Sequence, residues 1–470
     1  MMKNNQIQFN PEKTEVCLTP PPVLSGGTIA AIPSKSHAHR LLIAASLSAE
    51  PVRLICPVTS RDIDATADCL TAMGAAILGT EDGFMVRPRK NAPASAGDTA
   101  DPIRINVGES GSTLRFLLPV LGALGISALV EMEGRLPERP LSPLDEVLRG
   151  HGITLSSQGT NPLLISGRLT PGEYTISGGI SSQYITGLLF ALPLLTADSI
   201  LNVTGKLESR PYVDITLQVL REFGIRIEEH TSDASSPQDI STVFRIPGNQ
   251  CYQPVTEVQR VEADWSNAAF FLAAGALLTK PVTVTGCNMK SPQGDKRIVE
   301  LLRQFGASIE IREDPSDSGN VLSAVSVTGG HLRGIIIDAA DIPDLVPILA
   351  VTSAFAEGCT VIRNIDRLRI KESDRVATVM ETLQRLGARI EELPETDVPE
   401  LKAPRPGVTC LRIIGADTIP GGRVSSHNDH RIAMAAAIAS LRCTGPVTIL
   451  EPMAVTKSYP GFYEDLNRIN

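Results

Sequence analysis

The sequence lacks closely spaced cysteine pairs, although eight cysteines are scattered over its 470 residues. It contains no C-x-x-C motif, so the spacing predicts neither a disulfide framework nor a zinc site. The seven histidines form no H-x-x-x-H motif with a nearby acid, and we expect no metal site. Thiols buried in a reducing compartment are the interpretation that fits this distribution of cysteines.

Long apolar runs are also absent. The longest run, over residues 116–130, is interrupted by a proline and by glycines and is too short to span a bilayer. The first residues, Met-Met-Lys-Asn-Asn-Gln, contain no apolar stretch of the kind that secretory signals carry. We therefore expect a cytoplasmic protein without a membrane partner.

An excess of positive charge is the third feature that the chain lacks. Its formal net charge is −9, so no overall attraction to nucleic acid or to an anionic membrane is expected. The chain has no G-x-G-x-x-G or Walker motif, and we expect no nucleotide or other cofactor. An anion-binding site would have to be local, with Lys and Arg concentrated against the overall charge.

A weak internal repeat is the main feature that the chain does contain. An amphipathic helical segment, a glycine and a strand-like run recur at intervals of roughly 80 residues. The glycines of this phrase are Gly74, Gly152, Gly224, Gly306 and Gly387. A glycine after the last apolar turn is typical of a helix C-cap. A sixth helix of this type is predicted over residues 459–466.

A second type of helix recurs at the same interval and is apolar on nearly every face. Its six copies begin near Lys35, Gly111, Ser181, Asp264, Asp341 and Asn428. Such helices are buried on nearly every side, and short β-branched runs, for example 103–107 and 447–450, lie between them. The repeated combination predicts an α/β fold in which sheets surround buried helices.

Six repeats divide most simply into two domains of three repeats each. Polar breaks before Ser34 and around Glu262 suggest where the chain crosses between the domains. The predicted first domain is 34–262, and the second combines 1–33 with 263–470. Four polar stretches are predicted to be surface insertions between strands: 91–102, 231–241, 313–320 and 393–407.

Polar residues stand at the start of each apolar helix, and most of them are explained as helix caps. Ser34 or Ser36, for example, caps the helix that begins at Lys35. Capping does not explain Arg115 or Arg431, because an arginine in an apolar helix is costly unless it is paired. A helix start with nearby cations is also suited to binding an anion.

Cations gather at or near these helix starts. They are Lys35, Arg40, Arg115, Arg139, Arg210, Lys371, Arg375, Arg431 and Lys457. The spacing of four between Lys371 and Arg375 predicts that both lie on one face of a helix. Because Glu372 and Asp374 flank them, a solvated, self-paired charge cluster is an alternative interpretation.

Taken in series, the helix starts resemble the enolpyruvyl transferase family, and within it the EPSP synthases, over nearly the whole chain. The segments that carry the resemblance are 33–40 (PSKSHAHR), 108–115 (GESGSTLR), 138–140 (ERP), 181–183 (SSQ), 210–216 (RPYVDIT), 342–344 (IPD), 371–375 (KESDR), 428–431 (NDHR) and Lys457. The resemblance implies a two-domain inside-out α/β barrel. Each domain would contain three βαβαββ repeats, with an active-site cleft between the domains.

The resemblance implies an enzyme that transfers the enolpyruvyl (carboxyvinyl) group of phosphoenolpyruvate to the 5-hydroxyl of shikimate 3-phosphate. Phosphate would be released after addition to a tetrahedral intermediate and elimination, in the shikimate pathway that leads to chorismate and the aromatic amino acids. Each substrate carries a phosphate and a carboxylate, which suits a concentration of Lys and Arg. The implied partners are these two small molecules, with no nucleic acid and no membrane, and the family expectation is a monomer.

The resemblance also implies site residues by position. Those for shikimate 3-phosphate would be Lys35, Ser36, Arg40, Ser181, Ser182, Gln183, Ser209, Tyr212, Asp344 and Lys371. Those for phosphoenolpyruvate would be Lys35, Gly111, Arg139, Gln183, Arg375, Arg431 and Lys457. The catalytic residues would be Asp344 as base, Glu372 as the acid that protonates the methylene carbon, and Lys35 in contact with both substrates. Lys371 is a second candidate for the acid.

Four positions depart from the usual family pattern. Glu109 stands where Asn is common, Ser112 where Thr is common, Phe116 where Pro often follows the arginine, and Arg367 where Asn is usual. The reaction is still expected. The affinities and the sensitivity to phosphonate inhibitors such as glyphosate stay open.

Two alternatives stay open at this point. The first is a UDP-N-acetylglucosamine enolpyruvyl transferase, but that family typically has Lys-Asn where this chain has Lys35 and Ser36. It also has a reactive cysteine in the region that corresponds to 135–139, which holds none here. The second is a non-catalytic repeat scaffold that binds polyanions, which would have no need of Asp344 and Glu372.

Replacing Lys35 by methionine tests whether Lys35 binds both substrates, as the resemblance implies. The Lys35→Met variant loses a charged donor to each substrate, and a bond of that kind contributes about 1.5–3 kcal/mol. We expect the KM for each substrate to rise roughly tenfold or more. Steady-state kinetics with each substrate varied in turn would measure this, and a rise confined to one substrate would show that the shared role is wrong.

Overall fold

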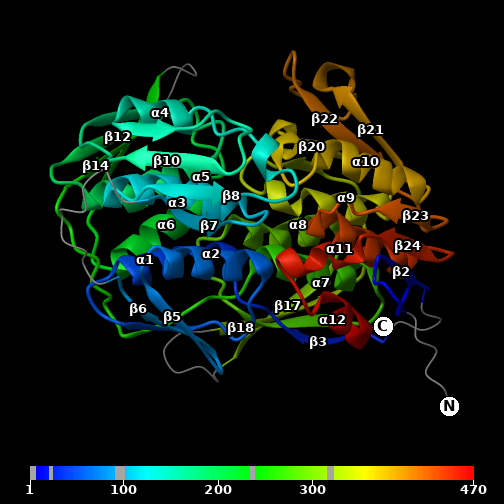
Figure 1. Cartoon of the computed structure of the whole chain (residues 1–470). Coiled ribbons are helices and arrows are strands. Elements are labelled where there is room, and N and C mark those ends of the chain that lie inside the picture. The colour runs from blue at the N-terminus through cyan, green and yellow to red at the C-terminus, as the bar shows by residue number, and fades with distance from the viewer. Residues whose placement is uncertain (1–6, 21–24, 90–100, 233–238, 315–321, 470) are drawn as a thin grey trace. The chain divides into compact units, whose positions relative to one another are not determined.

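The computed structural model describes residues 7–20, 25–89, 101–232, 239–314 and 322–469 (Figure 1). The chain divides into two compact units. Residues 33–261 form the continuous unit, and residues 1–32 and 262–470 form the split unit. The crossings expected from the sequence, at 33/34 and 262/263, each lie one residue after the corresponding boundary between the units. The assignment of an enzymatic domain to each part stays a prediction.

Among the described residues, each unit contains three four-stranded sheets of one recurring topology. In each sheet a parallel pair of strands is followed by two antiparallel neighbours, as in the sheet in which β7 and β8 are parallel and β10 and β9 follow. The sheets of the continuous unit are, in strand order, β15 (Val258–Arg260), β4 (Val52–Ile55), β6 (Gly83–Arg87), β5 (Ala76–Thr80); β7 (Ile103–Asn106), β8 (Ala128–Glu131), β10 (Leu163–Gly167), β9 (Ile153–Leu155); and β11 (Glu173–Ser177), β12 (Ser199–Thr204), β14 (Ile240–Ile246), β13 (Glu228–Thr231).

The split unit repeats this arrangement. Its sheets are, in strand order, β17 (Ser308–Asp314), β18 (Leu322–Thr328), β16 (Val282–Cys287), β3 (Gly27–Ala30); β19 (Ile336–Asp338), β20 (Cys359–Arg363), β22 (Thr409–Ile414), β21 (Arg389–Pro394); and β1 (Ile7–Phe9), β2 (Glu15–Leu18), β24 (Val447–Leu450), β23 (Gly422–Ser425). The last of these sheets joins the two ends of the sequence, because β2 pairs with β24. The N-terminal hairpin thus supplies the two strands that the sixth repeat lacks.

Two kinds of helix alternate along the chain, as the repeat predicts. Those buried on nearly every face are α1 (Lys35–Leu47), α3 (Gly111–Leu124), α5 (Ser182–Ala191), α7 (Trp265–Leu277), α9 (Val346–Ala354) and α11 (His430–Ala439). Those with one buried face are α2 (Arg61–Ala72), α4 (Leu144–Gly150), α6 (Arg210–Glu222), α8 (Ile298–Phe305), α10 (Arg375–Arg385) and α12 (Phe462–Ile469). The five predicted C-cap glycines all have a positive φ, between 72° and 106°, which confirms the left-handed residue expected there.

The buried helices form the centre of each unit's core. In the split unit α7, α9 and α11 pack against one another (Figure 1), and in the continuous unit α3 packs against α5. Gly187 permits the second contact, because a Cβ there would lie 2.4 Å from the carbonyl oxygen of Arg115. None of the helices in the described ranges is both long enough and apolar enough to cross a membrane.

The predicted caps are present, with corrections to two helix starts. Ser34, rather than Ser36, caps α1 by accepting a hydrogen bond from the backbone N–H of His37. The apolar helix expected near Asp341 begins later, at Val346, because residues 343–345 form the 3-10 helix η4 (Pro343–Leu345). The helix expected over 459–466 is α12, which starts after Pro460 and Gly461, residues that disfavour a helix interior.

The predicted insertion 393–407 begins two residues too early, because residues 393 and 394 still belong to β21. The remainder, 395–407, lies between β21 and β22 and contains the 3-10 helix η6 (Glu395–Asp397). Most of the other three predicted insertions falls outside the described residues. The side chain of Glu395 is fully buried and accepts hydrogen bonds from the guanidinium groups of Arg363 and Arg405. Burial raises the pKa of Glu395, but these bonds outweigh it and hold the pKa well below its ordinary value of 4.5.

The buried carboxylate of Glu395 makes stability depend on acid. Because its pKa is lower in the folded than in the unfolded protein, its contribution is complete above about pH 4.5 and is lost progressively as the pH falls below that value. We expect Glu395→Gln to lower the Tm at pH 7, with a difference from the wild type that shrinks between pH 5 and pH 3. Thermal unfolding across this range would measure it. The control Glu310→Gln, which removes an exposed pair with Arg312, should leave the Tm nearly unchanged.

Candidate active site

The guanidinium of Arg375 is the centre of a charged cluster in the split unit. Its side chain is 1% exposed, and it donates hydrogen bonds to three carboxylates. Its Nη1 lies 2.8 Å from Asp344 Oδ1, its Nη2 lies 2.7 Å from Glu372 Oε2, and its Nε lies 2.8 Å from Asp429 Oδ2. The two carboxylates expected to be catalytic, Asp344 and Glu372, are thus held by one cation.

Asp344 is in addition bound by two other cations. Arg431 Nη2 lies 3.1 Å from its Oδ2, and Lys371 Nζ lies 3.4 Å from its Oδ1. Burial raises the pKa of the Asp344 carboxyl, but the charges of Arg431, Lys371 and Arg375 outweigh burial and hold the pKa well below its ordinary value. We call Asp344, Lys371, Glu372, Arg375, Asp429 and Arg431 the charge cluster.

Asp429 links two helices of the cluster and has no exposed side-chain surface. It caps α11 by accepting a hydrogen bond from the backbone N–H of Arg431 at 2.9 Å, and it also accepts one from the hydroxyl of Ser373 at 3.0 Å. Burial raises the pKa of its carboxyl, but the charge of Arg375 outweighs burial and lowers the pKa overall. Asp429 therefore fixes the start of α11 relative to the first residue of α10.

Lys371 and Arg375 do not lie on one helix face, so this prediction from their spacing is wrong. Asp374 caps α10 through the backbone N–H groups of Val376 and Ala377, which makes Arg375 the first helical residue. Lys371 instead ends the 3-10 helix η5 (Asp366–Ile370) in an extended conformation. The two cations meet at Asp344, a residue that lies earlier in the sequence.

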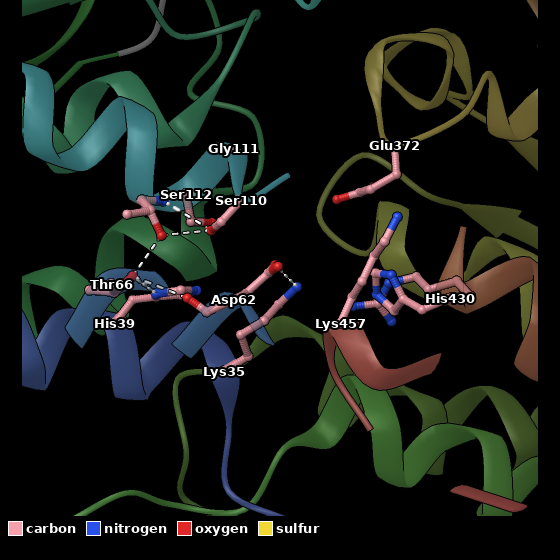
Figure 2. A network of polar contacts seen from close by, with 12 residues as sticks. Lys35, His39, Asp62, Thr66, Ser110, Gly111, Ser112, Glu372, His430 and Lys457 are labelled. Carbon is pink, nitrogen blue, oxygen red and sulfur yellow. Dashed lines mark hydrogen bonds and ion pairs between the residues drawn. The ribbon is translucent and has the colours of Figure 1, made fainter. Parts of the chain in front are cut away.

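Lys457 reaches the same part of the split unit from the 3-10 helix η8 (Pro452–Lys457). Its Nζ donates a hydrogen bond of 2.6 Å to the backbone carbonyl of Asn428, directly before Asp429. The close-up in Figure 2 shows that Glu372, His430 and Lys457 come from three separate segments. The residues predicted for phosphoenolpyruvate in this unit thus lie in or directly beside the charge cluster.

Asp295 is a buried acid of the split unit that the sequence did not indicate. It lies in the 3-10 helix η3 (Gly294–Arg297), where it accepts a hydrogen bond from the hydroxyl of Ser266. Burial, followed by the charge of Asp344, raises the pKa of Asp295 to about 7. Its position in sequence, next to Gly294 in a polar segment, resembles that of many solvated acids.

In the continuous unit Lys35 forms an ion pair with Asp62, with 2.8 Å between Nζ and Oδ2 (Figure 2). Lys35 is the first residue of α1, and Asp62 lies in the first turn of α2. Both side chains are more than four-fifths buried, at 15% and 13% exposure. Sequence reasoning identified the lysine and missed the aspartate, because only the packing of α1 against α2 brings the two together.

Arg40 is buried in the same unit with neutral partners. It donates to the hydroxyls of Thr216 and Thr186 and to the backbone carbonyls of Ser36 and Tyr212. Burial lowers the pKa of its guanidinium to about 9. The structure thus joins Ser36, Arg40 and Tyr212, three of the residues predicted for shikimate 3-phosphate.

The start of α3 gathers two further guanidinium groups. Arg115 Nη1 lies 3.1 Å from Gln183 Oε1, and Gln183 Nε2 lies 2.9 Å from the hydroxyl of Ser112. A Cβ at Gly111 would lie 2.4 Å from Arg115 Nη1 and 2.9 Å from Arg139 Nη1. Both guanidinium groups thus lie close to Gly111 at the start of the helix, and the ends of these side chains would have to shift to admit a Cβ there.

A chain of buried hydroxyls holds the start of α3 in place (Figure 2). His39 Nδ1 lies 2.7 Å from Thr66 Oγ1, which lies 2.6 Å from Thr113 Oγ1. Thr113 donates to the hydroxyl of Ser110, the N-cap of α3, at 2.7 Å. Burial, together with the charges of Lys35 and Arg40, lowers the pKa of His39 well below its ordinary value, so the imidazole is neutral. Ser110 and Thr113 belong to the segment 108–115 that carries the resemblance, whereas Thr66 did not stand out in the sequence.

The remaining predicted residues of the continuous unit lie at two other helix starts. Ser181 caps α5, and Ser182 is its first residue. Ser209 precedes α6 with a left-handed φ of 52°, which is uncommon for a residue other than glycine. Arg210, counted among the nine cations, is already neutralised by Asp214 and by a bidentate contact with Glu229.

Comparison with known proteins adds the family. The family model for EPSP synthase (3-phosphoshikimate 1-carboxyvinyltransferase) matches residues 21–466. The chain belongs to the EPSP synthase family. The prediction made from the helix starts is thereby confirmed.

Relatives in this family match over almost their full length. The 3-phosphoshikimate 1-carboxyvinyltransferase of Clostridium kluyveri is 37% identical over 464 residues, which are 98% of this chain and 97% of the relative. That of Clostridium acetobutylicum is 38% identical over 456 residues, 96% of this chain and 97% of the relative.

Solved structures of EPSP synthases and of another enolpyruvyl transferase share the fold. The EPSP synthase from Acinetobacter baumannii has a TM-score of 0.74 at 24% identity and covers 97% of this chain and 98% of its own. The enolpyruvyl transferase NikO from Streptomyces tendae has a TM-score of 0.68 at 20% identity and covers 97% of both chains. These likenesses confirm the inside-out α/β barrel predicted for this EPSP synthase family member, whereas the roles of its individual site residues stay predictions.

Removing the charge of Asp429 tests how far the charge cluster supports the fold. Asparagine is as good an N-cap as aspartate, so Asp429→Asn keeps the cap of α11 and removes the ion pair with buried Arg375. We expect a loss of about 3 kcal/mol in the free energy of unfolding, because the buried guanidinium of Arg375 loses one of its three charged partners and keeps only Asp344 and Glu372.

The matched control is Asp374→Asn, which changes the same residue type at the N-cap of neighbouring α10. Its weaker pair, with Arg369 at 3.6 Å, is partly exposed, and we expect a change below about 1 kcal/mol. Chemical denaturation of both variants would measure the difference, and equal losses would contradict the role given to the ion pair.

Proposed function

We propose that this protein transfers the enolpyruvyl group of phosphoenolpyruvate to the 5-hydroxyl of shikimate 3-phosphate and releases phosphate. The observation that carries the proposal is the charge cluster, in a chain of the EPSP synthase family. Two acids expected to move protons, Asp344 and Glu372, are both bound by Arg375. A polyanion-binding scaffold would have no use for acids that neutralise its cations.

The charge cluster suggests how substrate anions change the base. In the protein alone the pKa of Asp344 is held well below its ordinary value by Arg431, Lys371 and Arg375, which makes its carboxylate a weak base. Phosphate and carboxylate groups that bind these cations compete with Asp344 for them and add negative charge nearby. Both effects raise the pKa of a carboxyl, so substrate binding would make Asp344 a stronger base toward the 5-hydroxyl.

Addition and elimination need one proton moved to the methylene carbon and one removed from the hydroxyl. In the proposal Asp344 accepts the hydroxyl proton while the hydroxyl oxygen attacks C2 of the enolpyruvyl group, and Glu372 protonates C3. Return of a proton from C3 and departure of phosphate then regenerate the double bond. The cations stabilise the charge that develops on the phosphate and carboxylate oxygens.

In the continuous unit we propose that Arg40 and Lys35 bind anionic groups of the substrates. The pKa of Arg40 is lowered by burial, and its hydrogen-bond partners are hydroxyls and carbonyls. A nearby anion would compensate this buried charge. Arg115 and Arg139 at the start of α3 suit a second anion, since guanidinium groups bind phosphate and carboxylate through paired donors.

We also propose, from the family expectation and the composition, a cytoplasmic monomer that acts on these small molecules without a cofactor. Sedimentation of the purified protein would test the monomer.

Phosphate release from the purified protein with phosphoenolpyruvate tests the function itself. The acceptor is either shikimate 3-phosphate or UDP-N-acetylglucosamine, and each is also assayed without phosphoenolpyruvate. Release with shikimate 3-phosphate supports the proposal. Release with only UDP-N-acetylglucosamine, or with neither acceptor, would overturn it.

Neutral replacements of the two acids test their roles in proton transfer. We expect Asp344→Asn and Glu372→Gln to fold and to lose turnover by roughly a hundredfold or more, since a positioned acid or base contributes about 10²–10⁴-fold. Circular dichroism would check folding, and kcat with both substrates saturating would measure the loss. The control Glu357→Gln alters an exposed pair with His331 and should keep the wild-type kcat. A near-normal kcat for either acid variant would remove that residue from its role.

A further inference from the structure

A turn with left-handed backbone lies directly before the charge cluster. Seven residues other than glycine have a positive φ in the described chain, and three of them, His427, Asn428 and Glu451, belong to this turn or contact it. Their φ values are 50°, 54° and 54°. A residue with a Cβ adopts this conformation only at a cost in free energy, and such strain is characteristic of functional sites when the surrounding structure holds it in place.

The carboxylate of Glu451 holds the turn. Its Oε2 accepts a hydrogen bond of 3.0 Å from the hydroxyl of Ser425 and one of 3.2 Å from the backbone N–H of Asn428. The backbone carbonyl of Glu451 accepts a further bond of 3.0 Å from the hydroxyl of Ser426. Glu451 therefore connects the end of β24 to both ends of the segment 425–428, which we call the Asn428 turn.

The Asn428 turn presents two groups to the charge cluster. Its last carbonyl, that of Asn428, accepts the hydrogen bond of 2.6 Å from Lys457 Nζ. The next residue is Asp429, which binds Arg375 and caps α11. The backbone carbonyl of Asn428 thus helps to hold the ammonium group of Lys457 beside the first turn of α11.

We propose that Glu451 is a positioning residue for phosphoenolpyruvate: its carboxylate holds the Asn428 turn in the conformation that places Lys457. Glu451 acts through the backbone of Asn428 and has no direct contact with substrate in this proposal. The inference rests on the proposed function, in which Lys457 binds phosphoenolpyruvate.

The geometry also says which property of Glu451 matters. Both hydrogen bonds that its carboxylate accepts from described residues go to one oxygen, Oε2. A glutamine has one side-chain oxygen, which can occupy the position of Oε2. Its amide nitrogen then occupies the position of Oε1. The negative charge is therefore dispensable, and the acceptor is required.

The experiment compares Glu451→Ala with Glu451→Gln by steady-state kinetics with each substrate varied. For Glu451→Ala we expect the KM for phosphoenolpyruvate to rise about tenfold, the effect of losing two hydrogen bonds of ordinary strength. The KM for shikimate 3-phosphate should stay within about twofold of the wild type, a change too small to count as a lost hydrogen bond. Glu451→Gln should restore the KM for phosphoenolpyruvate to near the wild-type value.

Two further variants guard against an effect on folding alone. Ser425→Ala removes one of the two donors and should give an intermediate KM. Glu15→Ala removes an exposed pair with Arg423 from the same sheet and leaves the turn untouched, so it should keep the wild-type KM. A purely structural role would lower the Tm of Glu451→Ala and leave the KM for phosphoenolpyruvate unchanged.

The outcomes separate this inference from the proposed function. If the wild type turns over and Glu451→Ala has an unchanged KM for phosphoenolpyruvate, the positioning role is wrong. If Glu451→Gln behaves like Glu451→Ala, the charge is needed and the role assigned to a single acceptor oxygen is wrong. If the wild type releases no phosphate with either acceptor, the proposed function has failed first.

Discussion

A guanidinium group that is 1% exposed is stable only where its charge is compensated, and Arg375 has three carboxylates around it. This constraint organises the split unit around its candidate site. Asp429 starts α11, Asp344 follows β19, and Glu372 lies in the segment before α10, so one cation connects three parts of the chain. If any one carboxylate is removed, the other two must compensate a charge that water does not reach.

The same constraint explains how the cluster can be stable without a ligand and still be suited to binding anions. In the protein alone its acids and cations neutralise one another, and the pKa values of Asp344 and Asp429 are both lowered. An anionic ligand that binds one of these cations can take the place of a carboxylate, so the charge of the cation stays compensated. A site that binds anions need not be empty of negative charge before they arrive.

Most of the architecture could be predicted from the sequence, because repeats and helix caps are visible in short stretches of residues. The glycines after the amphipathic helices and the apolar bodies of the buried helices were readable from their neighbours alone. The cations were readable for a related reason, since an arginine such as Arg115 is conspicuous in an apolar helix. Their partners were not, because Asp62 and Asp429 look like ordinary caps or surface acids until packing brings distant segments together.

The errors have the same origin. Lys371 and Arg375 have helical spacing, but the cap formed by Asp374 starts the helix after the lysine. The missing strands of the sixth repeat could not be found nearby in the sequence, because the N-terminal hairpin provides them. Periodicity predicts what a segment forms by itself, and it does not predict which remote segment completes it.

That N-terminal hairpin has a consequence for the order of events during synthesis. The strand β2 precedes its partner β24 by more than 400 residues, so the sheet that joins them can close only after β24 has been synthesised. Residues 33–261 are contiguous and can assemble while the rest is still being made. Until then one edge of the β1–β2 hairpin is unpaired, and an unpaired strand edge can pair prematurely with other molecules.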